Sequence, residues 1–143
     1  MSKWNKQNFL SDLEENCSRE VVKITREIIK FSEKYSEHIS WGRGSEHGTM
    51  TFRCTSDVGL LPLFHLNSDG NINLQINFLR NKDIPKMVLR DMVVKLESNF
   101  LKEYDPGMYP IDSFEPIEDL FNTKSQITKF LKTIEGCAYR LKQ

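Results

Sequence analysis

The residues best able to do chemistry gather in one short stretch, HISWGRGSEHGTMTFRC, at residues 38–54. It holds a tryptophan, Trp41, two arginines, Arg43 and Arg53, and two histidines. Two guanidinium groups brought together could bind a carboxylate or a phosphate, because each offers a fork of N–H donors. A tryptophan beside them could stack on a base or another ligand. The stretch is therefore the first place to look for a binding site.

Each of these residues also has a structural interpretation. A tryptophan at a strand end most often anchors the core, and we favour that role for Trp41. Glycines on both sides of Arg43 favour a turn, since the chain lacks the spacing of a phosphate-binding or dinucleotide-binding loop. His47 lies beside Glu46, but the histidine spacing matches no HExxH or deaminase signature. We therefore assign no metal ligands.

Signatures of catalysis do not stand out elsewhere. The chain has no GxSxG elbow and no recognisable Cys/His pair of a cysteine enzyme. The strand that would carry the ExK motif of a metal-dependent nuclease reads Gln75-Ile76-Asn77, with neither acid nor lysine. The sequence thus leans toward a non-enzymatic protein without a cofactor. The alternative is a metal-dependent hydrolase acting on nucleic acid, with His47, Glu46 and the two arginines at work.

Length and composition set broader limits. A chain of 143 residues suits one domain, residues 1–143, and 20 basic against 20 acidic residues gives a formal net charge of zero. The whole molecule therefore has no electrostatic preference for nucleic acid or an anionic membrane. No run of about 18 apolar residues could span a bilayer, and the polar, acidic amino terminus does not read as a signal peptide. We expect a cytoplasmic protein.

Three cysteines, Cys17, Cys54 and Cys137, are odd in number and form no CxxC pair. This pattern argues against a disulfide framework and a structural zinc site. We expect free, buried thiols.

Hydrophobic periodicity predicts helices at about residues 4–16, 18–35, 84–100 and 125–141, the third with Asp83 as its cap. Between the second and third, alternation with a period of two predicts strands, the clearest being NINLQINF at 71–78. Turn signals at 57–59 and at Asp69-Gly70 join these strands as hairpins. Residues 105–116 read as a loop. The predicted fold is α+β: an antiparallel meander of three to four strands covered on one face by N-terminal and C-terminal helices.

If that strand runs to Phe78, its polar positions form an exposed row of amides that could bind a partner through hydrogen bonds. The row consists of Asn71, Asn73, Gln75 and Asn77. Together with the segment from Trp41 to Arg53, this exposed sheet face is the expected contact surface. The candidate binding residues are Trp41, Arg43, His47, Arg53, Asn73 and Gln75.

Charge is uneven near the carboxyl end. Residues 103–119 carry six acidic and no basic side chains, whereas residues 124–142 carry five basic side chains and one acidic. The two stretches could pair within the molecule. Alternatively, the basic face of the last helix could contact nucleic acid or an acidic partner, in a strongly salt-dependent way.

The segments WGRG at 41–44, GTMTF at 48–52, LFHL at 63–66 and DGNINL at 69–74 resemble a known type of domain. It is a small, poorly characterised microbial domain with a W-G-x-G turn and a sheet, sometimes accompanying restriction or other DNA-associated modules. The resemblance covers about residues 38–80 and rests on strand and turn residues. It implies no catalytic residues, and it favours partners from DNA-related or defence systems.

Taken together, these patterns favour a non-enzymatic interaction domain. The sequence does not decide whether its macromolecular partner is a protein or a nucleic acid. A homo-oligomer assembled through an exposed sheet edge is a further alternative.

Overall fold

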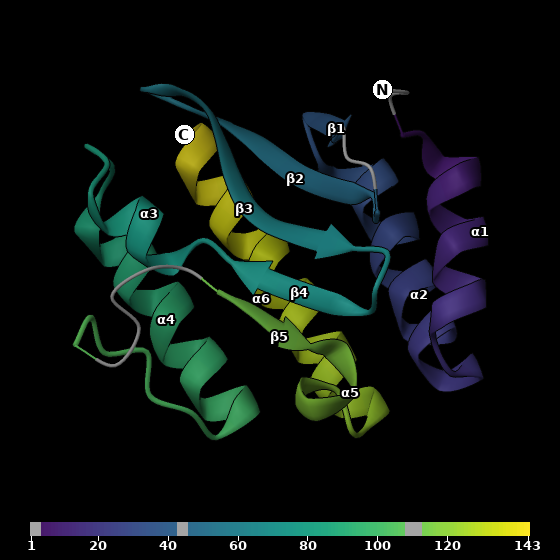
Figure 1. Ribbon diagram of the computed structural model, residues 1–143. Coiled ribbons are helices and arrows are strands. Elements are labelled where there is room, and N and C mark those ends of the chain that lie inside the picture. Colours follow the sequence, from purple (N-terminus) through teal and green to yellow (C-terminus); the bar gives the residue numbers. More distant parts are fainter. Residues whose placement is uncertain (1–3, 43–45, 108–112) are drawn as a thin grey trace.

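A computed structural model describes residues 4–42, 46–107 and 113–143 of the chain. It shows the predicted α+β fold, with one antiparallel sheet in the strand order β1-β2-β3-β4-β5. The sheet packs against helices from both ends of the chain, and α6 passes behind it in the view of Figure 1. The strand order follows the chain order, as in a meander, and the sheet has five strands where the sequence predicts three to four.

The elements have the following bounds: α1 (Lys6–Asn16), α2 (Arg19–Tyr35), β1 (His38–Trp41), β2 (Thr49–Ser56), β3 (Gly59–Asn67), β4 (Asn71–Leu74), α3 (Ile76–Arg80), α4 (Lys86–Phe100), β5 (Phe114–Pro116), α5 (Ile117–Leu120) and α6 (Lys124–Lys142).

The first two helices form where the sequence places them. Ser18 caps α2, its hydroxyl accepting a hydrogen bond from the Val21 amide at 3.3 Å. The apolar stripe of α2 is buried, with Ile28 fully so. In α1, Phe9 and Leu13 are fully buried, as their spacing predicts.

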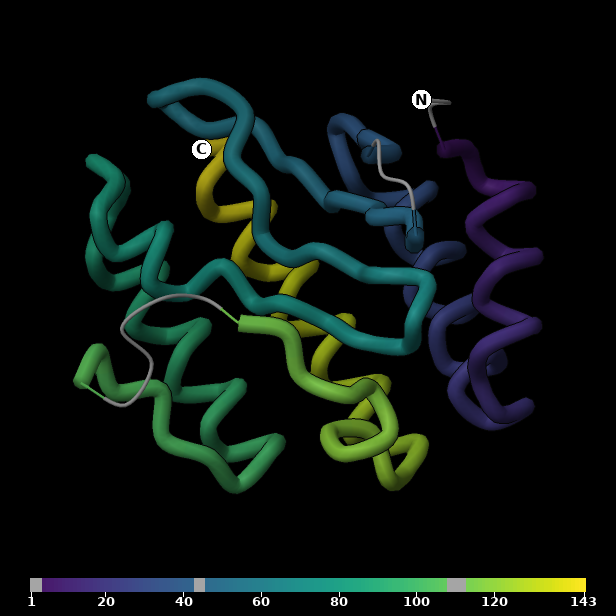
Figure 2. Tube along the Cα trace, viewed as in Figure 1, coloured from purple at the N-terminus to yellow at the C-terminus, as the bar shows by residue number. Residues whose placement is uncertain are grey.

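Two glycines allow the hairpins of the meander. Gly59, the first residue of β3, has φ +103°, and Gly70, between β3 and β4, has φ +88°, a region that residues with a Cβ rarely adopt. The β2–β3 hairpin is long, and its tip extends beyond the neighbouring strands (Figure 2). One extra residue in β3, Leu63, lies opposite the step from Phe52 to Arg53 and forms a bulge.

The strand predicted at 71–78 is shorter than expected. β4 ends at Leu74, and the chain then turns into the short helix α3. Ile76 and Leu79, three positions apart, are both buried there, whereas Phe78 is 37% exposed. Ile76 and Leu79 are thus buried at the spacing of a helix, whereas the sequence suggests burial of every second residue, as in a strand. The prediction of a strand through Phe78 is therefore wrong.

The stretch predicted as a loop at 105–116 contains the fifth strand. β5 pairs with β4, so that Asn73 lies opposite Phe114 and Ile72 opposite Glu115. A strand of three residues is too short to show alternation, and its pairing partner is distant in sequence. Neither feature can be detected from a local pattern.

The short helix α5 is absent from the prediction, and α4 begins with a different cap from the predicted one. Pro85 occupies the N-cap position of α4 without a side-chain hydrogen bond, so Asp83 is not the cap. For α6, Thr123 accepts a hydrogen bond from the Gln126 amide at 3.2 Å, and Gln126 accepts one in return from the Thr123 amide at 3.1 Å. This capping box fixes the start of the helix that covers the sheet.

Contacting phenylalanine rings run through the core and join the helices to the sheet. Successive ring centroids lie 5.2 to 5.9 Å apart. Such rings bury large apolar areas and favour offset-stacked or edge-on contacts. In order of contact they are Phe31, Phe52, Phe64, Phe130, Phe121 and Phe100.

Candidate functional site

Trp41 lies at the end of β1 and packs against the core. Its ring meets that of Phe9 in α1 edge to face, with centroids 5.5 Å apart. The Trp4 amide donates to the Gly42 carbonyl at 3.2 Å, next to this contact. These contacts match the structural interpretation of Trp41, because helix α1 lies against the tryptophan.

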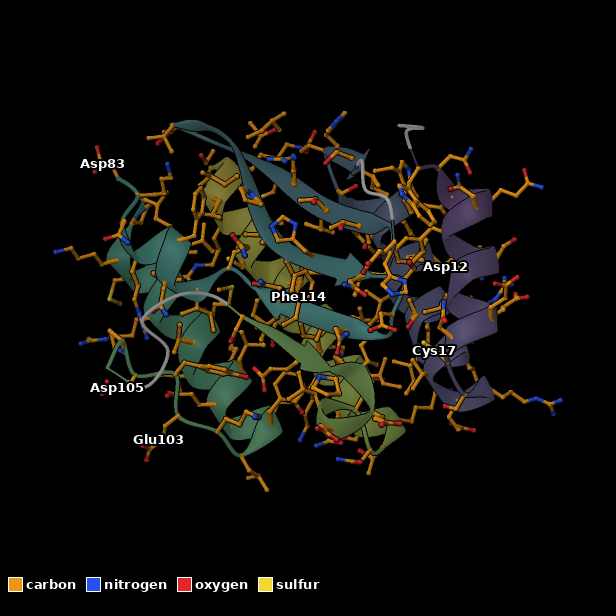
Figure 3. All side chains as sticks on the ribbon, in the orientation of Figure 1. Asp12, Cys17, Asp83, Glu103, Asp105 and Phe114 are labelled. Atoms are coloured by element: carbon orange, nitrogen blue, oxygen red, sulfur yellow. The ribbon has the colours of Figure 1, made fainter. Side chains whose placement is uncertain are left out.

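His47 also contacts α1. Its Nδ1 lies 2.9 Å from Asp12 Oδ2, and the same oxygen accepts a hydrogen bond from the Ser68 hydroxyl at 2.6 Å. Ser68 Oγ in turn accepts from the Gly48 amide at 2.8 Å. We call Asp12, His47 and Ser68 the helix-docking cluster. It fastens α1 to the loop before β2 and to the β3–β4 turn, and Figure 3 shows Asp12 on the side of α1 that faces the sheet.

The helix-docking cluster has a serine, a histidine and an aspartate but not the geometry of a hydrolase triad. In such a triad the serine is hydrogen-bonded to the histidine, which removes its proton. Here the Ser68 hydroxyl donates to the carboxylate instead, and the Ser68 side chain is fully buried. A substrate could not reach it without unfolding the local structure. The cluster is built to hold elements together.

The charges of the helix-docking cluster shift two pKa values. The hydrogen bond to Asp12 raises the pKa of His47 above its usual 6.5, although burial opposes the shift. Burial alone would raise the pKa of Asp12, but hydrogen bonds from His47 and Ser68 outweigh it and lower the pKa below its usual 3.8. Both shifts favour the ion pair between protonated His47 and ionised Asp12.

The two arginines of the stretch cannot be placed together. Arg43 lies outside the described residues. Arg53 is half-buried on β2, where it pairs with His38 of β1 and its Nε donates to Ser40 Oγ at 3.3 Å. The anion site that would need both arginines stays a prediction.

The expected row of exposed amides is contradicted. Asn73, Gln75 and Asn77 are only 6%, 9% and 9% exposed. Their polar groups bond within the protein: Gln75 Nε2 donates to Asn73 Oδ1 at 2.7 Å, and Asn77 Oδ1 accepts from Arg80. The physical reason is the pairing of β5 along β4 together with the turn into α3, which closes over these positions. Asn71 is half-buried.

The face of the sheet away from α6 carries Asn73 of the expected row together with residues of the other four strands. The strand register places Ser40, Thr51, His65, Asn73 and Phe114 opposite one another in a row across all five strands. Directly paired residues share a face, which we call the outer face. Thr51 Oγ1 lies 2.6 Å from His65 Nδ1 within this row. In Figure 1 the described helices lie behind or beside the sheet, and on the outer face Thr51 and Asn73 are each only 6% exposed, while Ser40 and His65 are half-buried.

The outer face has exposed apolar residues in two places: on β5 and on the β2–β3 hairpin. Phe114 on β5, labelled in Figure 3, is 44% exposed. Leu60, opposite Thr55 on the projecting β2–β3 hairpin, is 49% exposed, and Val58 in the same turn is 46% exposed. Local strand patterns do not reveal this arrangement, because Phe114 lies in a strand too short to recognise. The outer face is the candidate contact surface of the described chain.

Charged groups near the carboxyl end form specific pairs. In α6, Arg140 Nη1 lies 3.1 Å from Asp91 Oδ2, and Lys142 Nζ lies 2.5 Å from Glu37 Oε1. Neither of these carboxylates belongs to the acidic stretch 103–119. From that stretch, Glu115 pairs with Lys102 at 2.6 Å. Arg140, Lys142 and Glu115 therefore do not show the pairing between the acidic stretch and α6 that the sequence allows.

Within the described ranges, no group of three or more His, Cys, Asp or Glu side chains is arranged to hold a metal ion. The alternative of a metal-dependent hydrolase stays a prediction. In the same ranges, no helix combines the length and apolar character needed to cross a bilayer.

The fold defines an α+β protein with a five-stranded antiparallel sheet packed against N-terminal and C-terminal helices. No family model matches the chain, and neither a curated protein nor a solved structure matches it. The resemblance of residues 38–80 to a W-G-x-G domain stays a prediction.

Proposed function

We propose that this protein is a non-enzymatic interaction domain that binds a partner protein through the outer face of its sheet. The observation that carries the proposal is that two apolar side chains on the outer face, Leu60 and Phe114, are 49% and 44% exposed. Exposed apolar residues surrounded by polar ones are typical of protein contact surfaces.

Charge favours a protein over a nucleic acid as the partner. Among the described residues that the register places on the outer face, Arg53 is the one with a permanent positive charge. Binding to nucleic acid draws most of its affinity from several lysines and arginines at phosphates. A nearly neutral face with aliphatic and aromatic side chains fits a protein surface better. A link to DNA-related or defence systems rests on the sequence resemblance.

Site-specific photocrosslinking can test the proposal. A photoreactive phenylalanine analogue at position 60 or 114 of the full chain should capture a partner, which mass spectrometry identifies. The same analogue at position 139 is the matched control, because Tyr139 is 58% exposed but lies on α6.

The captured partner is then purified and its affinity measured directly. We expect the double variant Leu60→Ser with Phe114→Ser to bind it about tenfold more weakly or worse, while Tyr139→Ser binds as the wild type does. Equal affinity for all three proteins, or a nucleic acid as the captured species, would refute the proposal. Capture of a second copy of this chain, supported by light scattering, would instead identify a homo-oligomer.

A further inference from the structure

A separate groove lies where the end of α3 meets the exposed side of α4. It has a volume of about 520 Å³ and is lined by Arg80, Lys86, Met87, Leu89, Arg90, Val93 and Val94. We call it the α4 groove. Its size is in the range of ligand sites, but it is open along α4 rather than enclosed.

The α4 groove carries three positive charges, from Arg80, Lys86 and Arg90, and no carboxylate among its lining residues. None of the three forms an ion pair with the described part of the chain. The nearest acid on α4, Asp91, is engaged by Lys95 and Arg140. The groove therefore has a local positive charge in a protein whose formal net charge is zero.

Other nearby acids are turned elsewhere. Figure 3 shows Asp83, Glu103 and Asp105 at the periphery, with their side chains pointing away from the body of the protein. Asp105 Oδ1 accepts a hydrogen bond from the Gly107 amide of its own loop at 2.6 Å. Among the residues that the structure describes, no carboxylate therefore pairs with the positive charges of the groove.

Arg80 is held in place without being neutralised. Its Nη1 donates to Asn77 Oδ1 and its Nη2 donates to the Tyr104 carbonyl, and both acceptors are uncharged. A guanidinium has five N–H donors, so three remain for other acceptors. An arginine fixed by neutral groups is already oriented for a carboxylate and loses little entropy on binding.

The two cations on α4 lie where they weaken the helix. Lys86 is the first residue of α4 and Arg90 follows four positions later, with no acidic residue in the first turn. Like charges at this spacing repel, and positive charge at a helix amino terminus opposes the macrodipole. Negative charge from a ligand would relieve both effects.

The α4 groove also has an apolar wall. Met87 and Val94, two turns apart, are 68% and 55% exposed. The helical part of the lining, Lys86 to Val94, spans about 12 Å at about 1.5 Å per residue, which matches about four residues of extended peptide. An acidic peptide segment with large apolar side chains would meet both the charges and this wall.

We propose that the α4 groove binds a short acidic and apolar peptide segment of a partner protein. This site is distinct from the outer face, and its occupant is recognised by carboxylates at Arg80, Lys86 and Arg90 and by apolar side chains at Met87 and Val94.

The test uses the full chain and a fluorescent seven-residue peptide of alternating glutamate and leucine. The control peptide has glutamine in place of glutamate. We expect the acidic peptide to bind with an affinity that falls as salt rises, and the neutral peptide to bind about tenfold more weakly or worse. Equal affinities of the two peptides, or no binding of the acidic one, would overturn the proposal.

Variants locate the site. Lys86→Gln with Arg90→Gln should weaken binding of the acidic peptide about tenfold. Met87→Gln with Val94→Gln should weaken it as well. The matched control is Lys124→Gln with Lys129→Gln, which removes two exposed lysines of α6 outside the groove and should leave affinity unchanged. Equal losses in the α4 and α6 charge variants would show a nonspecific charge effect and overturn the proposal.

Two further binding experiments test whether the α4 groove binds a different kind of anionic partner. Vesicles containing phosphatidylserine and a single-stranded DNA are tested with the same charge variants. Binding of either one through Lys86 and Arg90, without binding of the acidic peptide, would overturn the proposal in favour of that partner. The variant Leu60→Ser with Phe114→Ser should bind the acidic peptide normally, so failure at the outer face and failure at the α4 groove are distinguishable.

Discussion

His47 Nδ1 lies 2.9 Å from Asp12 Oδ2 and thereby connects the loop before β2 to helix α1. Because Ser68 donates to the same carboxylate oxygen, one aspartate fastens two chain segments that are distant from it in sequence. The stretch 38–54 is the candidate site that the sequence singles out. Two of its residues, Trp41 and His47, contact the amino-terminal helix α1.

The Asp12–His47 pair should make stability depend on pH. The pKa of His47 is raised in the folded state, so its contribution is fully present below the unfolded pKa of about 6.5 and is lost as pH rises through the folded pKa. The pKa of Asp12 is lowered, so its contribution is present above about 3.8 and is lost as pH falls through the folded pKa.

Urea unfolding at a series of pH values checks this dependence. The difference in the free energy of unfolding between wild type and His47→Gln should be largest at about pH 5 to 6 and should shrink toward about pH 9. The exposed His38 provides the control variant His38→Gln. A difference that stays constant across this range would show that the pair does not titrate as proposed.

Gly48 lies under two aromatic rings of the amino-terminal region. A Cβ at this position would fall 2.6 Å from the Trp4 ring and 3.1 Å from the Phe9 ring. We expect Gly48→Ala to destabilise the protein by about 1–3 kcal/mol, because such overpacking must displace the rings. Chemical unfolding followed by tryptophan fluorescence measures the loss. Gly42→Ala, whose nearest contact would be 3.3 Å from Thr49 Cβ, should cost less, and the reverse order would contradict the packing described.

Gly136 and Gly70 should respond to alanine in opposite directions. Gly136 lies inside α6, and a Cβ added there would meet nothing within 4 Å, so Gly136→Ala should stabilise by about 1 kcal/mol. Gly70 has φ +88°, and a Cβ there would lie 2.8 Å from Cys17 Sγ, so Gly70→Ala should destabilise. Thermal unfolding of both variants tests the pair, and a lower midpoint for Gly136→Ala would count against the account of α6.

The three thiols should differ in reactivity. Burial raises the pKa of Cys54 and of Cys137 to about 12, so neither forms much thiolate at about pH 8. Cys17 is half-buried, and burial raises its pKa as well. With an aromatic disulfide reagent we expect one slow reaction in the native protein and three thiols after unfolding. Cys17→Ser should abolish the native reaction, and rapid modification of Cys54 or Cys137 would contradict their burial.

The sequence predicts those parts of the fold whose signals are local. The apolar stripe of α2, the turns at Gly59 and Gly70 and the alternation in β2 each follow from neighbouring residues, and the structure confirms them. Together they suffice for the α+β class and for the order of the first four strands.

The errors come from contacts between distant segments. Gln75 and Asn77 satisfy their hydrogen bonds inside the protein, which an alternating pattern cannot distinguish from exposure to solvent. The partner of β4 is β5, whose three residues give no period of their own. The contact between α1 and His47 likewise depends on tertiary packing. For this reason the candidate site moves from the amide row to the outer face.

The pairing of β4 with β5 has a consequence for biosynthesis. The first four strands join consecutive segments and can pair as soon as their hairpins leave the ribosome, since short loops close at little entropic cost. The far side of β4 must wait until residues 114–116 have been made. In that interval its free backbone groups are open to strand addition by another chain, so we expect aggregation of nascent or truncated forms that lack β5.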